Sequence, residues 1–503
     1  MRIRKQLAVS GIALLLGLVA CASGGSGAIE VKSGLVIHNV TVVNTRDGSS
    51  AANMNVLIEG GKIRKITERP VALTGTAQSI DGNGKYLVPG FLDMHTHAAG
   101  SLGLPPTDFP VLLANGITGI REAGGTPALI STLRAQNLGV IAGTVDAPEV
   151  LMMPSAIFAG QAPTDAGARQ FVRDRLAEGA DFIKVAGGSP LSFLAVIDEA
   201  RKQGKHAAGH MTNAVSAADS SNAGYHSFEH LGAGLGLMID CSSDEAALRA
   251  AVLANPVPPP ANVVNPRLFD GNQYAPYYQR ILDTYSEAKC RALAQTFVKN
   301  DSWQTVTLIR LRTADFGTAA LYRNDPNLAY VDKTRRALWE SVAQQVETTL
   351  KPATLDTLQK FYALQLKVVK VFAQNGVKIT AGSDLGGGFV IPGFSLHQEF
   401  KELAAAGLTP LQVLQATTLN GAQFAGREAS IGTVEEGKNA DLVLLDANPL
   451  ADVANLDRIS AVFNKGRYYS RSALDKLLSD VAAAYRALPL QALHTALDPS
   501  HID

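Results

Sequence analysis

The 503-residue chain is 46% hydrophobic and 18% charged, a composition typical of a globular protein with a large core. Its 45 basic and 45 acidic residues give a formal net charge of zero, which excludes the strongly basic surface of a nucleic-acid-binding protein. The length allows two or three domains, or one large α/β barrel with additions.

The first 20 residues are typical of a secretory signal peptide. Three basic residues precede an apolar run over residues 7–20, which is shorter than the roughly 20 residues of a membrane-spanning helix. The run ends in LVAC, which resembles a bacterial lipobox and predicts cleavage before Cys21 and lipidation of that residue. Residues 21–33 would then tether an exported protein to the periplasmic face of a membrane, with the outer membrane of a Gram-negative bacterium favoured. A plain signal peptide with an unrelated cysteine is the alternative.

Short runs with alternating apolar residues occupy both ends of the remaining chain. Residues 34–88 contain LVIHNVTVV and MNVLIEGGKIRKI, and residues 430–475 contain ADLVLLDANPL and ISAVFNKG. Such runs, separated by Gly and Asn, predict strands. Because they lie on either side of a long α/β region, we expect one small β-sandwich built from both ends. Residues 476–503 are expected to form a helix and a tail.

The middle of the chain, residues 89–429, alternates strand-like and helix-like stretches in about eight units. The strand-like stretches include LGVIAG (138–143), DFIKVAGG, HAAGHMTN, YHSFEH, WQTVTLIRL (303–311, expected as strand seven) and VKITAGSD. Repeated strand-then-helix units predict a parallel sheet, and about eight of them favour a closed (β/α)8 TIM barrel.

Residues 232–300 are too long for an ordinary barrel unit and are predicted to be an insertion. Tyr274, Tyr277 and Tyr278 within it are candidates for the wall of a substrate pocket. A helical decoration away from the site is the alternative. The insertion also contains Cys241 and Cys290, which could form a disulfide or remain two free thiols.

Candidate metal ligands end several of the predicted strands. The stretch PGFLDMHTH closes the first barrel strand with His95 and His97, whose side chains point the same way because they are two residues apart. Two imidazoles at one place suit a transition metal. His210, His230 and Asp384 each end another predicted strand, so a barrel would gather all five side chains at one mouth.

Two basic side chains also lie at predicted strand ends. A bare ammonium at Lys184 would be costly if it pointed inward, and it cannot bind a cation. Reaction with CO₂ would turn it into an anionic N-carboxylysine that can bridge two metals; a lysine that reaches solvent or contacts substrate is the alternative. Arg121 is either a bidentate partner for a substrate carboxylate or, with Glu122, part of a network that braces the barrel mouth, and the pattern does not decide between them.

The motifs together resemble the amidohydrolase superfamily, metal-dependent (β/α)8 hydrolases with a β-sandwich built from both chain ends. The resemblance covers residues 34–470 and is closest to the branch of imidazolonepropionase-like proteins and Xaa-Pro dipeptidases. It rests on GGKIRKI, LVPGFLDMHTH, GITGIREAGG, DFIKV, SFEHL, AGSD, ATTLNGAQFAG and IGTVEEGKNADLVLLDANPL.

The resemblance implies a role for each candidate ligand. His95 and His97 would hold the more buried of two divalent metal ions, and Asp384 would complete that site and carry a proton. His210 and His230 would hold the second ion, and carboxylated Lys184 would bridge the two. Zinc is the default metal, with manganese or cobalt as replacements.

The expected activity is therefore hydrolysis of the amide C–N bond of a peptide, a dipeptide or an N-acyl amino acid by a metal-bridging hydroxide. A cyclic-amide hydrolase or deaminase on the same scaffold is one alternative, and a metal-holding lipoprotein without catalytic activity is another. The expected partners are a small-molecule or peptide substrate and, through the lipid anchor, a membrane. No nucleic acid is expected, and a homo-oligomer is left open.

Overall fold

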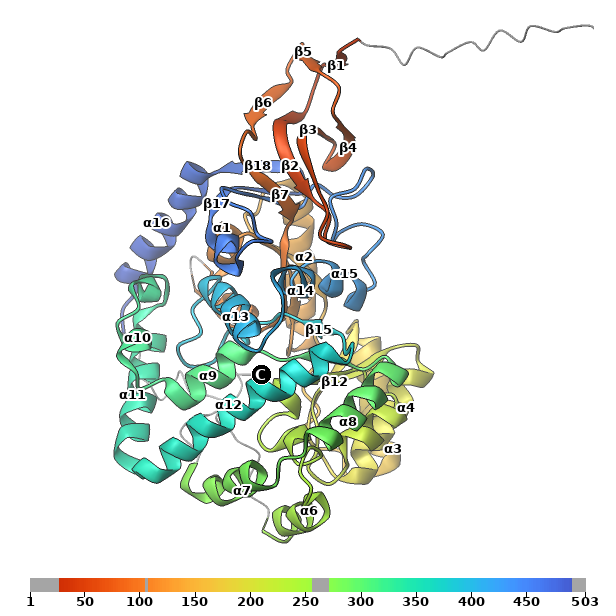
Figure 1. Cartoon of the computed structure of the whole chain (residues 1–503), viewed down its shortest axis with the longest axis vertical. Helices are drawn as coiled ribbons and strands as arrows, with labels where there is room; N and C mark the ends of the chain where they lie inside the picture. The colour runs from red at the N-terminus through yellow and green to blue at the C-terminus, as the bar shows by residue number, and fades with distance from the viewer. Residues whose placement is uncertain (1–26, 105–106, 256–270, 491–503) are drawn as a thin grey trace, which may run out of the picture.

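The computed structural model describes residues 27–104, 107–255 and 271–490. The chain forms a parallel barrel with a mixed sheet at one end of it (Figure 1). Among the described residues, no helix combines the length and the apolar character needed to cross a membrane. The predicted lipidation site, Cys21, lies outside the described residues.

Eight parallel strands build the barrel in two sheets, ordered β10-β9-β8 and β11-β12-β13-β14-β15. Their bounds are β8 Phe91–Thr96, β9 Ile117–Glu122, β10 Glu149–Met152, β11 Phe182–Ala186, β12 His206–His210, β13 Ser227–Glu229, β14 Trp303–Thr305 and β15 Ile379–Thr380. Single parallel bridges join the outer edges of the two sheets, Thr96 to Leu385 and Phe158 to Val185. The eight strands thus form a ring, which confirms the predicted (β/α)8 fold.

Helices cover the outside of the ring. They are α1 Phe109–Ala114, α2 Pro127–Ala142, α3 Asp165–Ala177, α4 Pro190–Lys202, α5 Ala217–Ala223, α13 Phe394–Ala405, α14 Pro410–Ala416 and α15 Leu419–Phe424. The predicted strand over residues 138–143 is wrong, because residues 138–142 end α2 and β10 is the third strand. The side chain of Thr126 caps the start of this helix and Gly143 ends it at φ 75°, so the apolar run between them turns helical.

Two long segments interrupt the alternation of strand and helix. Between β13 and β14 lie η3 Gly236–Met238, α6 Glu245–Ala254, α7 Gly271–Thr284 and α8 Glu287–Asn300, in the region predicted as an insertion. Between β14 and β15 lie α9 Leu308–Phe316, α10 Ala320–Arg323, η5 Pro326–Tyr330, α11 Lys333–Thr349 and α12 Pro352–Gln374. The seventh strand is shorter than predicted: Thr307 adopts φ 44°, which ends the extended run, and α9 begins at the next residue.

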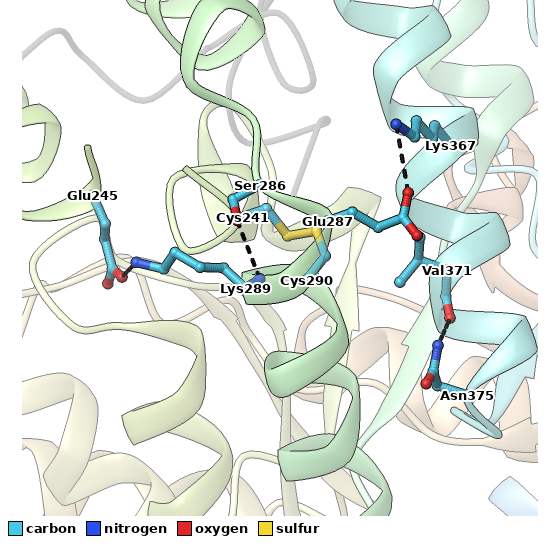
Figure 2. The surroundings of a disulfide bond; sticks show 9 residues. All are labelled: Cys241, Glu245, Ser286, Glu287, Lys289, Cys290, Lys367, Val371 and Asn375. Atoms are coloured by element: carbon cyan, nitrogen blue, oxygen red, sulfur yellow. Dashed lines mark hydrogen bonds and ion pairs between the residues drawn. A yellow bond between two sulfur atoms is a disulfide. The ribbon is translucent and has the colours of Figure 1, made fainter. Parts of the chain in front are cut away.

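A disulfide ties the first of these segments together. Cys241 follows η3 and Cys290 lies on α8, with their Cα atoms 4.7 Å apart and both residues buried. Figure 2 shows the bond beside an ion pair between Lys289 and Glu245, whose Nζ and Oε2 atoms are 2.5 Å apart. Of the two states that the sequence leaves open, the structure contains the disulfide.

The mixed sheet combines strands from both ends of the chain, in the order β18-β17-β16-β7-β2-β3-β4 with β6 beside β2. The bounds are β2 Leu35–Val43, β3 Ser50–Glu59, β4 Lys62–Thr67, β6 Gln78–Asp81, β7 Tyr86–Pro89, β16 Leu442–Leu445, β17 Ile459–Asn464 and β18 Arg467–Ser470; β1 Ile29–Val31 pairs separately with β5 Val71–Leu73. In Figure 1 the early strands lie next to the late β17 and β18, and helix α16 Arg471–Ala487 follows β18. Inward-facing Ile37, Val56, Leu87 and Phe463 form the core of this sheet. Only one residue separates β7 from β8, so the sheet fixes the first barrel strand.

Candidate metal centre

The six side chains predicted as metal ligands converge at the carboxyl ends of the barrel strands. His95 and His97 lie at the end of β8, Lys184 on β11 and His210 at the end of β12, while His230 directly follows β13 and Asp384 lies four residues after β15. Oδ1 of Asp384 lies 3.3 Å from Nε2 of His95 and 3.4 Å from Nε2 of His97, and its Oδ2 lies 3.7 Å from Nε2 of His230. Nζ of Lys184 lies 3.3 Å from Nε2 of His95, and the rings of His210 and His230 are 5.1 Å apart.

The backbone around the site brings these residues together. The amide of Asp384 donates to the carbonyl of His95 at 2.8 Å, and Asp93 accepts hydrogen bonds from the amide and the hydroxyl of Ser383 at 2.9 and 2.6 Å. The first and last strands of the ring are thus joined beside their ligands. His230 and Asp384 both adopt φ 54°, a left-handed conformation that is uncommon outside glycine. Such strain persists where the surrounding structure imposes it, often at functional sites.

Burial keeps the imidazoles in the form that binds metals. It lowers the pKa of His95 to about 4 and that of His210 to about 3, and it holds the pKa of His230 well below its usual value. The rings are therefore neutral at pH 7, and a neutral imidazole offers a lone pair to a cation. Thr307 contacts Nδ1 of His230 through its hydroxyl, which points Nε2 of that ring into the site.

The unsatisfied atoms of the site fit a bound cation. Nε2 of His210, Nε2 of His230 and Oδ2 of Asp384 are buried and have no hydrogen-bond partner among the described residues. The ligand atoms of His95, His230 and Asp384 all lie within 4.8 Å of one another. Tetrahedral ligands at about 2.1 Å from a zinc ion would stand about 3.4 Å apart, close to the separations around Asp384. The residues present therefore fit a divalent metal ion.

Glu229 is a site residue that the sequence reasoning missed. It is fully buried at the end of β13, and its carboxylate contacts Nζ of Lys184. Its Oε2 lies 3.1 Å from Nδ1 of His95, and its Oε1 lies 2.6 Å from Nη2 of Arg121. The available signal was an acidic residue directly before His230 in SFEHL, on a strand otherwise expected to be buried.

Arg121 is buried, whereas a residue that binds a substrate carboxylate would have to be accessible from the mouth of the barrel. Its side chain is fully buried, Nε donates to the carbonyl of Met94 at 2.6 Å, and the guanidinium lies over the rings of Phe182 and Phe424. Its anionic partner is Glu229. This placement favours the bracing role over contact with a substrate carboxylate, although the acidic partner is Glu229 in place of the expected Glu122.

The three tyrosines proposed for a pocket wall lie on α7. Tyr274 and Tyr278 are buried, and the ring of Tyr278 packs 4.3 Å from that of Phe361 on α12. Tyr277 is partly buried against the same core. None of the three lines the cavity beside the metal centre, as far as the described residues delimit it. Their packing favours the alternative in which this part of the insertion decorates the barrel.

The cavity beside the centre lies between α9, α11 and the loop after β15 and is partly open to solvent. Arg310 lines it and reaches the metal centre, since its Nε lies 3.5 Å from Oδ2 of Asp384. Arg310 is the second residue of the site that the sequence reasoning did not identify.

Comparison with known proteins agrees with this architecture. Residues 365–468, which include Asp384, match the amidohydrolase family. An imidazolonepropionase of Thermoplasma volcanium is 30% identical over 139 residues, which are 25% of this chain and 32% of that protein. The matched segments span about a third or less of the first curated relatives.

Two solved structures share the fold over most of the chain. Bottromycin amidohydrolase aligns with a TM-score of 0.68 at 22% identity, covering 92% of this chain and 93% of that chain. A Xaa-Pro dipeptidase with bound methionine in its active site aligns with a TM-score of 0.61 at 16% identity, covering 87% of this chain and 100% of that chain. Residues 365–468 are thus similar to the amidohydrolase family, and the chain shares its fold with a Xaa-Pro dipeptidase and with bottromycin amidohydrolase.

Proposed function

We propose that the protein is a metal-dependent hydrolase that cleaves the amide C–N bond of a peptide, a dipeptide or an N-acyl amino acid. The observation that carries the proposal is the convergence of four imidazoles with Asp384 at the mouth of the barrel, where the rings of His95, His210 and His230 are neutral. The similarity of fold to a Xaa-Pro dipeptidase and to an amidohydrolase supports this substrate class.

The ligands divide into two groups. His95 and His97 would hold one divalent ion together with Asp384, and His210 and His230 would hold a second. When bound, such ions polarise a carbonyl and lower the pKa of a water between them to near 7. Zinc suits a site this rich in imidazole.

Lys184 would link the two groups as its N-carboxylated form. Its side chain is 2% exposed and burial lowers its pKa, which favours the neutral amine that can attack CO₂. The new N–C bond forms as the nitrogen loses a proton, and the product is an anion with two ligand oxygens. Carbon-13 NMR of protein prepared with labelled bicarbonate should show a carbamate signal that is absent from Lys184→Ala.

Asp384 would move the proton. One of its oxygens lies between the imidazoles, and the other faces His230 and Arg310. This position allows the carboxylate to accept a proton from the attacking water and to return it to the leaving amine as a general acid.

The test combines metal analysis with a panel of dipeptides, N-acyl amino acids and cyclic amides. About two metal ions per chain and amide hydrolysis that is lost in Asp384→Asn would support the proposal. Asp475→Asn is the matched control, since Asp475 is exposed on α16. Stoichiometric metal without turnover of any amide would refute the proposal and favour the binding lipoprotein.

A cyclic-amide hydrolase or deaminase is the second candidate. It is favoured by the sequence similarity to an imidazolonepropionase. This candidate would release ammonia or open a ring in the same panel, with no turnover of linear dipeptides.

We also propose that the protein is exported and anchored through a lipid on Cys21. The disulfide between Cys241 and Cys290 supports export, because such bonds persist in oxidising compartments such as the periplasm. Labelled palmitate should be incorporated into the full-length protein, and Cys21→Ala should abolish incorporation and release the protein from membranes. Equal labelling of both proteins would overturn the assignment of Cys21.

A further inference from the structure

The cavity between α9 and α11 has the layout of a side-chain pocket. One face of α9 and one face of α11 oppose each other across it, each with residues at helical spacing. The lining residues include Arg310, Thr313 and Ala314 from α9, Trp339 and Ala343 from α11, and Phe389 from the loop after Asp384. The walls are mostly apolar, and Arg310 is the one charged residue among those that line the cavity in the described part of the chain.

Arg310 connects this cavity to the reaction centre. Its side chain is 6% exposed and its Nε lies 3.5 Å from Oδ2 of Asp384, beyond an ordinary hydrogen bond but within reach of an ion pair. A guanidinium presents five N–H donors in a fixed plane, a geometry that suits the two oxygens of a carboxylate.

Gly387 makes room for this placement. A Cβ atom at residue 387 would stand 2.3 Å from both Cδ and Nε of Arg310. The guanidinium therefore lies directly on the backbone of the loop that follows Asp384, and any side chain at this residue would push it away.

The position of Arg310 determines how a substrate would lie. In an N-acyl amino acid, a single carbon separates the carboxylate from the amide nitrogen, so the two groups are a few ångströms apart. A carboxylate held by Arg310 would place the amide nitrogen beside Asp384, the group proposed to protonate the leaving amine. The side chain on that same carbon would then enter the cavity and meet Trp339 and Phe389, whose rings pack against each other with their centroids 5.6 Å apart.

We propose that Arg310 and this cavity select substrates whose leaving group is a large apolar amino acid with a free carboxylate, such as N-acyl derivatives of leucine, methionine or phenylalanine. This inference rests on the proposed amide hydrolysis and adds the identity of the amino acid that leaves when the amide bond is cleaved. Arg310 is a specificity-determining residue that recognises the carboxylate, and Ala343 and Trp339 set the size of the side chain.

The first experiment compares the metal-loaded enzyme on N-acetyl-leucine and on its carboxamide. The wild type should prefer the carboxylate by about 10- to 100-fold in kcat/KM, and Arg310→Gln should remove that preference mainly through KM. Arg312→Gln is the matched control, because Arg312 lies two residues away on α9, pairs with Glu402 and does not line the cavity. Gly387→Ala should reproduce the loss by displacing the guanidinium. An equal fall on both substrates in Arg310→Gln would overturn the proposal.

The second experiment tests the cavity by filling it. Ala343 is 3% exposed, and Ala343→Phe should lower kcat/KM for N-acetyl-leucine at least 10-fold more than kcat/KM for N-acetylglycine. Loss of both substrates in a protein with unchanged unfolding temperature would overturn the assignment of the cavity.

A binding measurement separates this inference from the proposed function. The chain has two tryptophans, so Trp303→Phe leaves Trp339 as the only indole reporter. Binding of 3-phenylpropionate should change its fluorescence, and Arg310→Gln should weaken that binding at least 10-fold. If no amide is hydrolysed but the ligand binds in this way, the proposed function fails and the pocket stands; absence of binding would overturn the pocket itself.

Discussion

The buried pair of Arg121 and Glu229 gives a direct test of how the floor of the site is built. Both side chains are fully buried, and Nη2 and Oε1 are 2.6 Å apart. At an effective dielectric constant of 20, unit charges at that distance attract by about 6 kcal/mol. Removing one member of such a pair usually costs about 3–5 kcal/mol, because the other charge stays buried. Since Glu229 keeps its contact with Lys184, we expect Arg121→Met to cost about 3 kcal/mol of unfolding free energy.

The assay is equilibrium urea unfolding of Arg121→Met, Glu229→Gln and the double variant. The two changes should be strongly non-additive, with a coupling of at least about 1 kcal/mol, because they remove the same interaction. Arg173→Met is the control: its partner is Glu199, its side chain is 42% exposed, and an exposed pair contributes at most about 1 kcal/mol. Additive losses would refute the bracing role. An Arg121→Met enzyme with full stability and a raised KM for carboxylate substrates would instead make Arg121 the substrate contact.

Three further predictions concern stability. The disulfide closes a loop with a sequence separation of 49, so replacing both Cys241 and Cys290 by Ala should lower the free energy of unfolding by about 4 kcal/mol. Reductant should destabilise the wild type in the same way, and a wild type that loses no stability in reductant would contradict this prediction. Removal of metal by a chelator should lower Tm, since a ligand at 100 times its Kd stabilises the folded state by about 2.7 kcal/mol. The chelator should lower the Tm of His210→Ala by less than it lowers the Tm of the wild type. An equal fall in both proteins would argue against His210 as a ligand. Burial raises the pKa of Glu149, but ion pairs with Lys465 and Arg427 outweigh burial and leave that pKa below its usual value. Stability from this carboxylate is therefore complete above about pH 4.3 and lost as the pH falls through the lowered pKa. Glu149→Gln should flatten that acid limb of a Tm–pH curve, and an unchanged slope would refute the assignment.

The sequence predicted the parts of the site that depend on local spacing. His95 and His97 share a direction because a strand repeats every two residues, and His210 and Asp384 could be placed at strand ends from the apolar runs before them. Short apolar runs carry less information: residues 138–143 suit a buried strand as well as the end of a helix, and the caps at Thr126 and Gly143 decide for the helix.

The missed residues act through partners that are distant in the sequence. Glu229 gains its role from Arg121 and Lys184, which lie on two other strands, so SFEHL indicates a buried acid but does not identify its partners. Arg310 was assigned to a strand, where its direction could not be judged. It reaches Asp384 only because Thr307 turns the chain into a helix and Gly387 leaves space for the guanidinium.

The charges at the centre bear on whether Lys184 is carboxylated. Arg121 and Glu229 form a fixed pair of opposite charges and burial favours the neutral amine of Lys184, so Asp384 is left to balance Arg310. Two divalent ions would add four positive charges to a buried site that holds no net negative charge, and a large desolvation cost opposes that arrangement. Carboxylation turns the neutral amine of Lys184 into an anion and so gives the site one additional negative charge, which favours binding of the two ions. The Lys184→Glu protein should therefore retain more metal than Lys184→Met, although Met is closer to lysine in shape. The reverse order of metal content would show that the shape of this side chain, and not its charge, determines metal binding.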